Sequence, residues 1–506
     1  MCGFFITNDP LVNSSHESII ESKLRFRGPD YSSGFIYHNG WIAYHSRLSI
    51  IGLESSANQP VISHKGSLLV FNGEILNYKE LGYKYFDKEY TSDTLLLCDL
   101  LDNEKISLDE LDGFFAFVYI NELGVLKYSA RDKFGVKPLF YYENNGFITF
   151  SSEPICLTSI FDNVVSEEAV EEYRVTRAPI FSGSYYKDIN TVQPGCCYVN
   201  GQYFNLLDYI GKEYTDTDNS IIEEAISTGV STRIISDAPV GLLLSKGVDS
   251  NLINSLGDFD KKYSIGFEGD ADITYLLNKN IPNLHVVTCT AETYREAFEY
   301  LLQLRGEPMS VPNEVLLYLI AKDAAADGVK VLLSGEGADE FFAGYDRIFT
   351  WAAGCINFEL DRFLELYCYS QPEKDGTLYK KFEKLFEKKS HLTCFEQVRW
   401  FFIKYHMPIL FRRLDFSLMA AGVEGREPIA NMHTFVKAVK ISPEDLMING
   451  LGKKPLRDIL SRYLGEEFAF EKKVGFPVNL KNIFSEDSEL SSYDIWFKNN
   501  LKVFSK

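Results

Sequence analysis

The stretch MCGFFITNDP places a cysteine, Cys2, directly after the initiator methionine. If Met1 is removed, a thiol and a free α-amine share one residue, and the neutral amine can accept the thiol proton without a second side chain. That arrangement would make Cys2 an N-terminal nucleophile. The alternative is that Cys2 is a small apolar residue of a first strand. Position 2 by itself does not decide between the two.

Two later stretches place small and acidic residues directly after short apolar runs, LLLSKGVDS at 242–250 and VLLSGEGADE at 331–340. The first offers backbone N–H groups and hydroxyls ahead of a helix, a setting that binds phosphate. The second adds carboxylates, which tolerate a nearby phosphate only when a cation such as Mg²⁺ lies between them. Asp249 and Asp339 are therefore magnesium candidates. Each loop alone is also compatible with an ordinary strand-to-helix turn, and neither is a Walker A motif.

The elements around these residues change character near residue 210. Before it, short β-rich runs alternate with turn signals, which predicts a sheet-dominated half. After it, helical patterns such as TYREAFEYLLQL alternate with short apolar strands, which predicts a parallel α/β sheet. Ligands bind beyond the carboxyl ends of such strands, where both loops fall. We predict two domains, residues 1–210 and 211–506.

Composition excludes several classes of function. Of the 506 residues, 51 are Lys or Arg and 71 are Asp or Glu, and the net charge of −20 would repel nucleic acid and anionic membranes. The 9 cysteines show no metal-binding spacing, which fits a reducing compartment. No stretch approaches the ~18 apolar residues of a membrane helix, and we expect a cytoplasmic protein.

Several motifs, in the right order over nearly the whole chain, resemble known domains. The first group of motifs resembles the class II glutamine amidotransferase domain; it comprises MCGFF, RFRGPD, HSRLSIIG, QPV, FNGEILNY and TSDTLLL. The second group resembles the synthetase domain of glutamine-dependent asparagine synthetases; it comprises LSKGVDS, LLSGEGADE, GVEGREP and KKPLRDIL. The resemblance implies an αββα N-terminal-nucleophile sandwich followed by an α/β parallel-sheet ATP-pyrophosphatase domain. The resemblance does not decide whether the chain forms a homodimer.

In the first domain, the resemblance implies that Cys2 attacks the glutamine amide to give a γ-glutamyl thioester and ammonia. Asn72 and Gly73 would form the oxyanion hole, a role suited to an amide and a backbone N–H. Arg47 would pair with the glutamine α-carboxylate, and Asp93 with its α-ammonium. The glutamine-binding candidates are Arg47, Leu48, Ser49, Ile50, Ile51, Asn72, Gly73, Glu74 and Asp93.

In the second domain, the resemblance implies that Glu336 helps to form or use an acyl-adenylate. Lys453 would stabilise released pyrophosphate as a point charge. Asp249 and Asp339 would hold Mg²⁺. The ATP-binding candidates are Leu244, Ser245, Gly247, Asp249, Ser250, Ile265, Ser334 and Gly335.

The chain departs from the family pattern at three places. Lys246 stands where the family has a glycine. Either it denies a backbone conformation with positive φ or close approach of the chain to phosphate, or its ammonium is recruited to a phosphate or to an acidic acceptor, and we expect recruitment. Glu427 stands where an apolar residue is common. The segment EKKVGFPVNL is a shortened form of a family segment.

The expected function is ATP-driven, glutamine-dependent amidation of a carboxylate through its adenylate, with aspartate as the default acceptor. Two alternatives stay open. The acceptor can be another carboxylate, such as a uronic acid of a surface polysaccharide or a natural-product acid. The chain can also be a glutaminase-only or regulatory protein whose synthetase site is impaired by Lys246.

Overall fold

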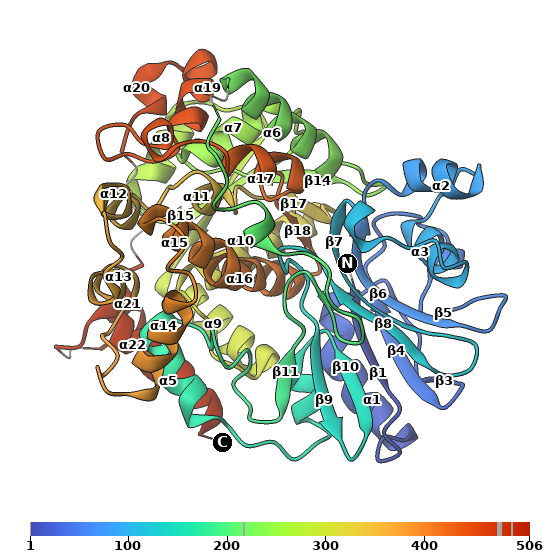
Figure 1. The fold of residues 1–506 in the computed structure, drawn as a ribbon. Coiled ribbons are helices and arrows are strands. Elements are labelled where there is room, and N and C mark those ends of the chain that lie inside the picture. The colour runs from blue at the N-terminus through green and yellow to red at the C-terminus, as the bar shows by residue number, and fades with distance from the viewer. Residues whose placement is uncertain (1, 216–217, 473–477, 487–488, 506) are drawn as a thin grey trace.

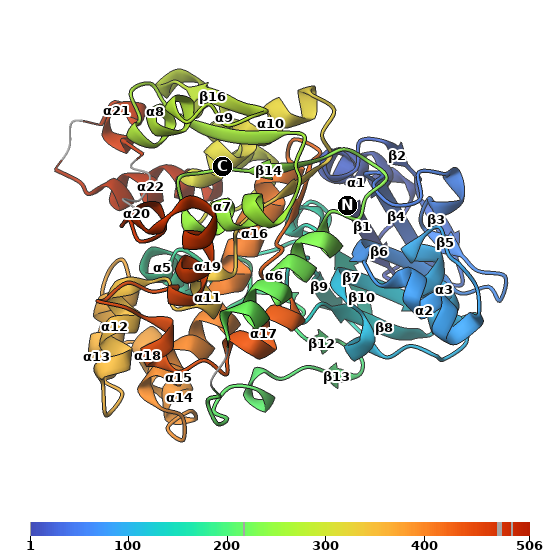
Figure 2. The same ribbon diagram turned by 90° about the horizontal axis from the view of Figure 1, so that it is seen from above.

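The computed structural model describes residues 2–215, 218–472, 478–486 and 489–505. Figures 1 and 2 show the blue-to-teal strands on one side of the molecule and most of the green-to-red elements on the other. The segment EKKVGFPVNL includes residues 473–477, which lie outside the described residues. No described helix is both long and apolar enough to span a bilayer.

The first half contains two antiparallel sheets. One has the strand order β11-β9-β10-β1-β4-β2 with β3 paired to β4, and the other has the order β13-β12-β8-β7-β6-β5. The strands of the first sheet are β1 Cys2–Thr7, β2 Tyr31–Ser32, β3 Ile36–His38, β4 Trp41–Arg47, β9 Phe140–Asn144, β10 Phe147–Ser151 and β11 Ile189–Thr191. Those of the second are β5 Val61–Ile62, β6 Leu68–Ile75, β7 Gly113–Ile120, β8 Leu126–Arg131, β12 Cys196–Cys197 and β13 Gly201–Gln202.

Alternation along β1 explains the layering of this half. Phe4 and Ile6 pack between the two sheets, whereas Phe5 faces the helices α1 (Glu17–Leu24) and α4 (Pro154–Thr158). The second sheet is covered on its outer face by α2 (Tyr78–Phe86) and α3 (Asp93–Asp102). The order helix, sheet, sheet, helix confirms the predicted αββα sandwich.

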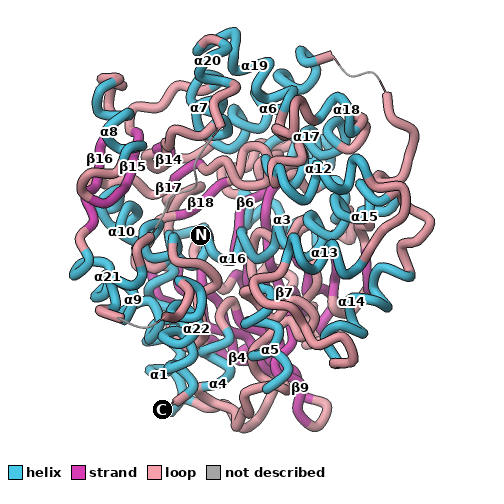
Figure 3. Tube along the Cα trace, turned by 90° about the vertical axis from the view of Figure 1, so that its left-hand side faces the viewer, coloured by secondary structure: helices cyan, strands magenta, loops and turns pink. Residues whose placement is uncertain are grey.

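The second half contains the predicted parallel sheet, with strand order β16-β15-β14-β17-β18. Its strands are β14 Val240–Leu243, β15 Lys262–Phe267, β16 Leu284–Cys289, β17 Val331–Leu333 and β18 Glu424–Arg426. Both faces of the central strands β14 and β17 are buried, which explains their apolar runs, whereas β16 is partly exposed and β18 is the buried segment Glu424–Arg426 with two charged residues. Figure 3 shows them among surrounding helices.

Helices of the second half pack on both faces of this sheet. Residues of α10 and α16 cover one face, and residues of α6, α7 and α19 cover the other. The helices are α6 Asn219–Arg233, α7 Val248–Leu256, α8 Ala271–Asn278, α9 Ala291–Arg305, α10 Asn313–Ala326, α11 Ala338–Phe341, α12 Asp346–Gly354, α13 Leu360–Tyr367, α14 Thr377–Glu387, α15 Cys394–Phe401, α16 Met407–Met419, α17 Met432–Ala438, α18 Pro443–Leu446, α19 Lys454–Leu464, α20 Glu466–Ala469, α21 Leu480–Phe484 and α22 Ser492–Asn500.

One helix of the first half packs among helices of the second. This is α5 (Glu167–Thr176), whose Ala169 and Tyr173 belong to an apolar cluster with Tyr294 and Trp496. Figures 1 and 2 both place α5 on the side of the second half. Helix α5 therefore lies against the second half although it precedes residue 210, and the chain returns to the sheets of the first half at β11, β12 and β13.

Candidate active sites

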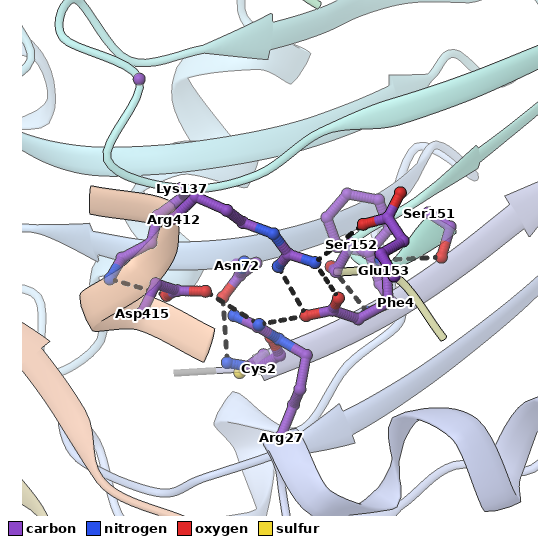
Figure 4. Close-up of polar contacts among 12 residues, drawn as sticks. Cys2, Phe4, Arg27, Asn72, Lys137, Ser151, Ser152, Glu153, Arg412 and Asp415 are labelled. Carbon is purple, nitrogen blue, oxygen red and sulfur yellow. Dashed lines mark hydrogen bonds and ion pairs between the residues drawn. The ribbon is translucent and has the colours of Figure 1, made fainter. Parts of the chain in front are cut away.

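The first candidate site forms where β1 of one sheet meets β6 of the other. The backbone N–H of Cys2 donates to Asn72 Oδ1 at 3.0 Å, and both residues are buried (Figure 4). Asn72 Nδ2 is buried and has no hydrogen-bond partner among the described residues. It is therefore a spare donor close to Cys2, as an oxyanion hole requires. Met1 lies outside the described residues, and its removal stays a prediction.

The surroundings of Cys2 do not by themselves ionise the thiol. Burial raises the pKa of Cys2, and the positive charge of Arg47, its register partner on β4, opposes this only in part. The Arg47 guanidinium donates to Asn58 Oδ1 at 2.8 Å and to backbone carbonyls of the loop that follows β4. That loop contains Leu48–Ile51, which were predicted to bind glutamine together with Arg47. The Arg47 side chain therefore orients the rest of its predicted glutamine-binding segment.

Two buried carboxyl groups lie beside each other near Cys2. Asp93, the first residue of α3, accepts from the N–H groups of Ile75 at 3.0 Å and Thr94 at 2.7 Å. Burial, and then the neighbouring Asp93, raise the pKa of Glu74 well above its ordinary value. A cationic group such as an α-ammonium would relieve this crowding of acids.

Gly73 lies between Asn72 and Glu74 and requires glycine. Its φ is +144°, and a Cβ built there would lie 2.1 Å from the Phe114 carbonyl oxygen on β7. Only glycine lets β6 and β7 approach so closely while Gly73 keeps this backbone conformation.

The second candidate site is a cavity of about 440 Å³ at the carboxyl ends of β14, β15 and β17. Most of the predicted synthetase residues line it, namely Leu244, Ser245, Asp249, Ser250, Ile265, Ser334, Gly335, Glu336 and Asp339. Gly247 is not among its lining residues; it precedes α7, a helix with no side-chain N-cap, and its N–H donates to Ser245 Oγ at 3.1 Å. The N–H groups at the start of a helix suit an anion.

Lys453 lies between the two predicted metal ligands. Its Nζ is 2.7 Å from Asp249 Oδ2 and 2.8 Å from Asp339 Oδ1. Burial works against the charged form, but the two carboxylates hold the pKa of Lys453 above its usual value. A Cβ at Gly335 would lie 2.7 Å from the Asp249 Cβ, so glycine there lets the two loops meet. The structure thus brings Asp249, Asp339 and Lys453 to one point.

Glu336, which lines this cavity, and Glu340, which does not, also have partners. Glu336 forms an ion pair with Arg413 of α16. Tyr345 donates its hydroxyl to Glu340 Oε1 at 2.6 Å, and burial raises the pKa of Glu340 to about 8. Glu336 is therefore the carboxylate held against a cation at the cavity wall, whereas Glu340 is mostly protonated at neutral pH.

Comparison with known proteins finds a family model for each half of the chain. The family model for asparagine synthase matches residues 222–493, and the model for the glutamine amidotransferase domain matches residues 1–209. The chain belongs to the asparagine synthase family. Asparagine synthetase [glutamine-hydrolyzing] 1 of Bacillus subtilis is 30% identical over 68% of this chain and 59% of its own length.

Other relatives in the asparagine synthase family match over longer stretches. A putative asparagine synthetase [glutamine-hydrolyzing] 1 of Methanocaldococcus jannaschii is 28% identical over 85% of this chain and 80% of its own length. Asparagine synthetase B [glutamine-hydrolyzing] of Escherichia coli is 25% identical over 94% of this chain and 82% of its own length. The chain spans less than two thirds of the Bacillus subtilis relative.

Lys246 stands where the family has glycine, and its side chain contacts Glu471 and Tyr275. Its Nζ is 2.6 Å from Glu471 Oε1 and 4.7 Å from the centre of the Tyr275 ring. It is not among the described non-glycine residues with positive φ. The backbone therefore does not demand glycine here, and the side chain has partners other than a phosphate.

Lys246→Gly is expected to change the KM for ATP by no more than about fivefold, because a half-exposed ion pair contributes little free energy. Steady-state kinetics with varied ATP measure this. A tenfold or larger rise in KM would instead show that the ammonium leaves Glu471 for a phosphate, as the sequence predicts.

A cluster of buried charges between the two halves was missed by the sequence analysis. Arg27 Nη1 lies 2.6 Å from Glu153 Oε1 and 2.9 Å from Asp415 Oδ2 (Figure 4). Lys137 Nζ is 3.3 Å from Asp415, and Arg412 donates to Glu153 at 3.0 Å. Arg27 also donates from Nε to the Cys2 carbonyl at 3.0 Å. The motif RFRGPD contained Arg27, but hydropathy patterns cannot reveal buried, mutually paired charges.

Glu427, the other departure from the family pattern, follows β18 and is buried close to this cluster. Burial raises its pKa to about 8, and the positive charge of Lys137 offsets only part of that effect. The folded protein therefore keeps a proton on Glu427 at neutral pH, whereas the unfolded chain loses it near pH 4.5.

The free energy of unfolding should therefore fall as pH rises between about 4.5 and 8, because the folded state binds the extra proton there. Glu427→Gln removes the titrating carboxyl group. Between pH 5 and 8 we therefore expect the free energy of unfolding of the variant to fall by about 2 to 4 kcal/mol less than that of the parent. Denaturant unfolding at several pH values measures the slopes, with exposed Glu444→Gln as control. Equal slopes for the parent and Glu427→Gln would contradict the assignment.

Proposed function

We propose that this chain hydrolyses glutamine at Cys2 and uses the ammonia to amidate a carboxylate that ATP has activated as its adenylate, with aspartate as the acceptor. Residues 1–210 would perform the first reaction and residues 211–506 the second. The family membership and the names of the relatives support this reading, as does the presence of both constellations in one chain.

In the glutamine half, Cys2 Sγ would attack the side-chain amide carbon while the free α-amine of Cys2 takes the thiol proton. The carbonyl oxygen becomes negative, and Asn72 Nδ2 and the Gly73 N–H would stabilise it. The proton then passes to the leaving nitrogen, and the tetrahedral adduct collapses to the γ-glutamyl thioester as ammonia departs. Water would then hydrolyse the thioester to glutamate and restore the Cys2 thiol. Glu74 and Asp93 would bind the α-ammonium of glutamine, and Arg47 its α-carboxylate.

In the synthetase half, the loop from Ser245 to Ser250 would receive the phosphates of ATP. Asp249 and Asp339 fit a magnesium site, because their oxygens already converge on one cation, the Lys453 ammonium. When bound there, Mg²⁺ would neutralise phosphate charge. Lys453 would stabilise pyrophosphate as the acceptor carboxylate attacks the α-phosphorus, and Glu336 would act beside the adenylate when ammonia attacks it.

The proposal that the two reactions are coupled rests on one observation. Helix α16 contributes residues to the charge cluster beside Cys2 and to the synthetase cavity. Its Arg412 and Asp415 join the buried cluster whose Arg27 donates to the Cys2 carbonyl. Its Arg413 pairs with Glu336 in the synthetase cavity. Helix α16 is therefore an element shared by the surroundings of both sites between which ammonia would pass.

The test is a screen of the purified protein with glutamine, ATP and Mg²⁺ against aspartate and other acids, with pyrophosphate release as the readout. Pyrophosphate release that depends on aspartate supports the proposal. Release with a uronic acid and not with aspartate would replace the acceptor. Glutamine hydrolysis without acid-dependent pyrophosphate release would favour the glutaminase-only alternative.

A further inference from the structure

A further cavity lies between the two halves of the chain, apart from both candidate active sites. It has a volume of about 140 Å³, and we call it the junction cavity. The end of β8, the start of β9 and the segment after α5 line one side; the end of α9 and the helix α16 with the segment before it line the other. Cys2, Asp249 and Asp339 are not among its lining residues, so it lies outside both catalytic constellations.

The lining of the junction cavity is strongly cationic. Glu307 is the one carboxylic acid among the described residues that line it, whereas five lining residues are cations. These cations are Arg131, Arg177, Arg305, Lys404 and Arg412. A concave surface with this balance of charges attracts anions, in contrast to the molecule as a whole, whose net charge is −20.

Two of the five cations already have a buried carboxylate as partner. Arg305 Nη1 lies 2.7 Å from Glu314 Oε2, and Arg412 Nη2 lies 2.5 Å from Glu153 Oε2. Neither Glu314 nor Glu153 lines the junction cavity. The positive charge of these two arginines is therefore largely compensated from behind the cavity wall.

The other three cations have no counter-charge. Among the described residues, no carboxylate lies within the 4.0 Å of an ion pair with Arg131, Arg177 or Lys404. Arg131 instead donates to three backbone carbonyls, at 2.7, 3.0 and 2.8 Å. Burial lowers the pKa of Lys404, which lies in the π-helical segment Phe402–His406. A desolvated and unpaired ammonium is costly unless an anion accompanies it.

Three hydrogen-bond donors of the lining are also unused. Arg177 Nε, Arg305 Nε and Ser310 Oγ are buried, and none has a hydrogen-bond partner among the described residues. Arg305 and Ser310 are only 6% and 4% exposed, so bulk water does not supply the missing acceptors. Buried donors nearly always find an acceptor in protein, bound water or a bound ion. Unused donors and unpaired cations in one cavity together indicate a ligand that is negatively charged and rich in acceptors.

The backbone at Arg177 also indicates a requirement for its side chain. Its φ is +72° and its ψ is 0°, the left-handed conformation that glycine adopts with less strain at a helix C-terminus. The preceding helix α5 is fixed to the second half, because Tyr173 donates its hydroxyl to the Met309 carbonyl at 2.8 Å. Arg177 lines the synthetase cavity as well, on a wall built from helices that includes His406 and Arg413. It is thus held where the two halves meet.

We propose that the junction cavity binds a phosphate group and that the bound anion bridges the two halves of the chain. Guanidinium groups, an ammonium and a hydroxyl are the donors from which phosphate oxygens accept. The volume lies below the ~300–1,000 Å³ of pockets for drug-sized ligands, which favours free phosphate or a small ester over a nucleotide. The proposal requires no turnover and stands independently of the proposed function.

The experiment is calorimetric titration of inorganic phosphate into the parent and its variants at pH 8 and constant ionic strength. Lys404→Gln removes an unpaired cation and should weaken phosphate binding about 10- to 100-fold. Ser310→Ala removes one neutral donor and should weaken it about 3- to 10-fold. Neither residue lines the synthetase cavity, so these losses are distinct from binding at the ATP site. Exposed Lys380→Gln on α14 is the matched control and should bind phosphate as the parent does.

Glu307→Gln should have the opposite effect on phosphate binding. Burial raises the pKa of Glu307 to about 7, so the acid is mostly ionised at pH 8 and opposes an anion in the same cavity. Its removal should tighten phosphate binding about 3- to 10-fold at this pH. A variant that tightens binding cannot owe its effect to a damaged fold.

Glycerol 3-phosphate, titrated in parallel, distinguishes the two sources of the phosphate group. Tighter binding of inorganic phosphate supports the free ion, and tighter binding of glycerol 3-phosphate supports an ester. The inference is overturned if the parent binds neither more tightly than about 10 mM. It is equally overturned if Lys404→Gln and Ser310→Ala bind phosphate within twofold of the parent, because the anion would then lie elsewhere.

Discussion

Cys2→Ala should reduce glutamine-dependent amidation to background, a loss of at least about 10⁴-fold, because no other group can form the thioester. Amidation with added ammonium salt should persist at a rate close to that of the parent, since the synthetase cavity is formed by other elements. Pyrophosphate release with each nitrogen source measures both rates.

The matched control for this variant is Cys98→Ala, which removes another buried free thiol of the same half. It should retain activity with both nitrogen sources. Equal loss of the glutamine and ammonia reactions in Cys2→Ala would contradict the assignment of two separate sites. Retention of Met1 should resemble Cys2→Ala, because the α-amine would then be an amide and no longer a base.

Asp249→Asn and Asp339→Asn should each lower ATP-dependent amidation by about 100-fold or more, while glutamine hydrolysis stays largely intact. Each substitution removes one of the two carboxylates that converge on Lys453, and with it a ligand and a charge needed beside the phosphates of ATP. Pyrophosphate release at several magnesium concentrations measures the loss.

Raised magnesium should partly restore these two variants, because weaker metal binding is compensated by mass action. Asp260→Asn, which changes an exposed aspartate after α7, is the control and should behave as the parent does. Normal pyrophosphate release at ordinary magnesium in either variant would show that its residue does not hold the metal.

The elements that carry the two sites were predictable because their signals are local. The loops SKGVDS and SGEGADE follow apolar runs, and the carboxyl ends of parallel strands meet at one sheet edge, so Asp249 and Asp339 were expected to approach each other. In the first half, short β-rich runs between turn signals predicted strands, and the resemblance of the motifs implied that Cys2 and Asn72 act at one site.

The helical wall of the synthetase cavity could not be predicted in the same way. Arg177 lies 68 positions before Ser245, in the other half of the chain, and only the packing of α5 places it there. Arg27 and Asp415 are separated by 388 positions. Charged residues normally indicate an exposed face, so a sequence pattern gives no sign that these side chains are buried in pairs.

The left-handed backbone at Lys453 has a consequence for anyone who improves this protein by selection. With a φ of +62°, glycine at this position would release about 1 kcal/mol of backbone strain. It would also remove the cation between Asp249 and Asp339, whose two carboxylates would then repel each other. The two effects on stability oppose each other, so lysine that persists at 453 in a library selected for heat resistance does not by itself report selection for turnover.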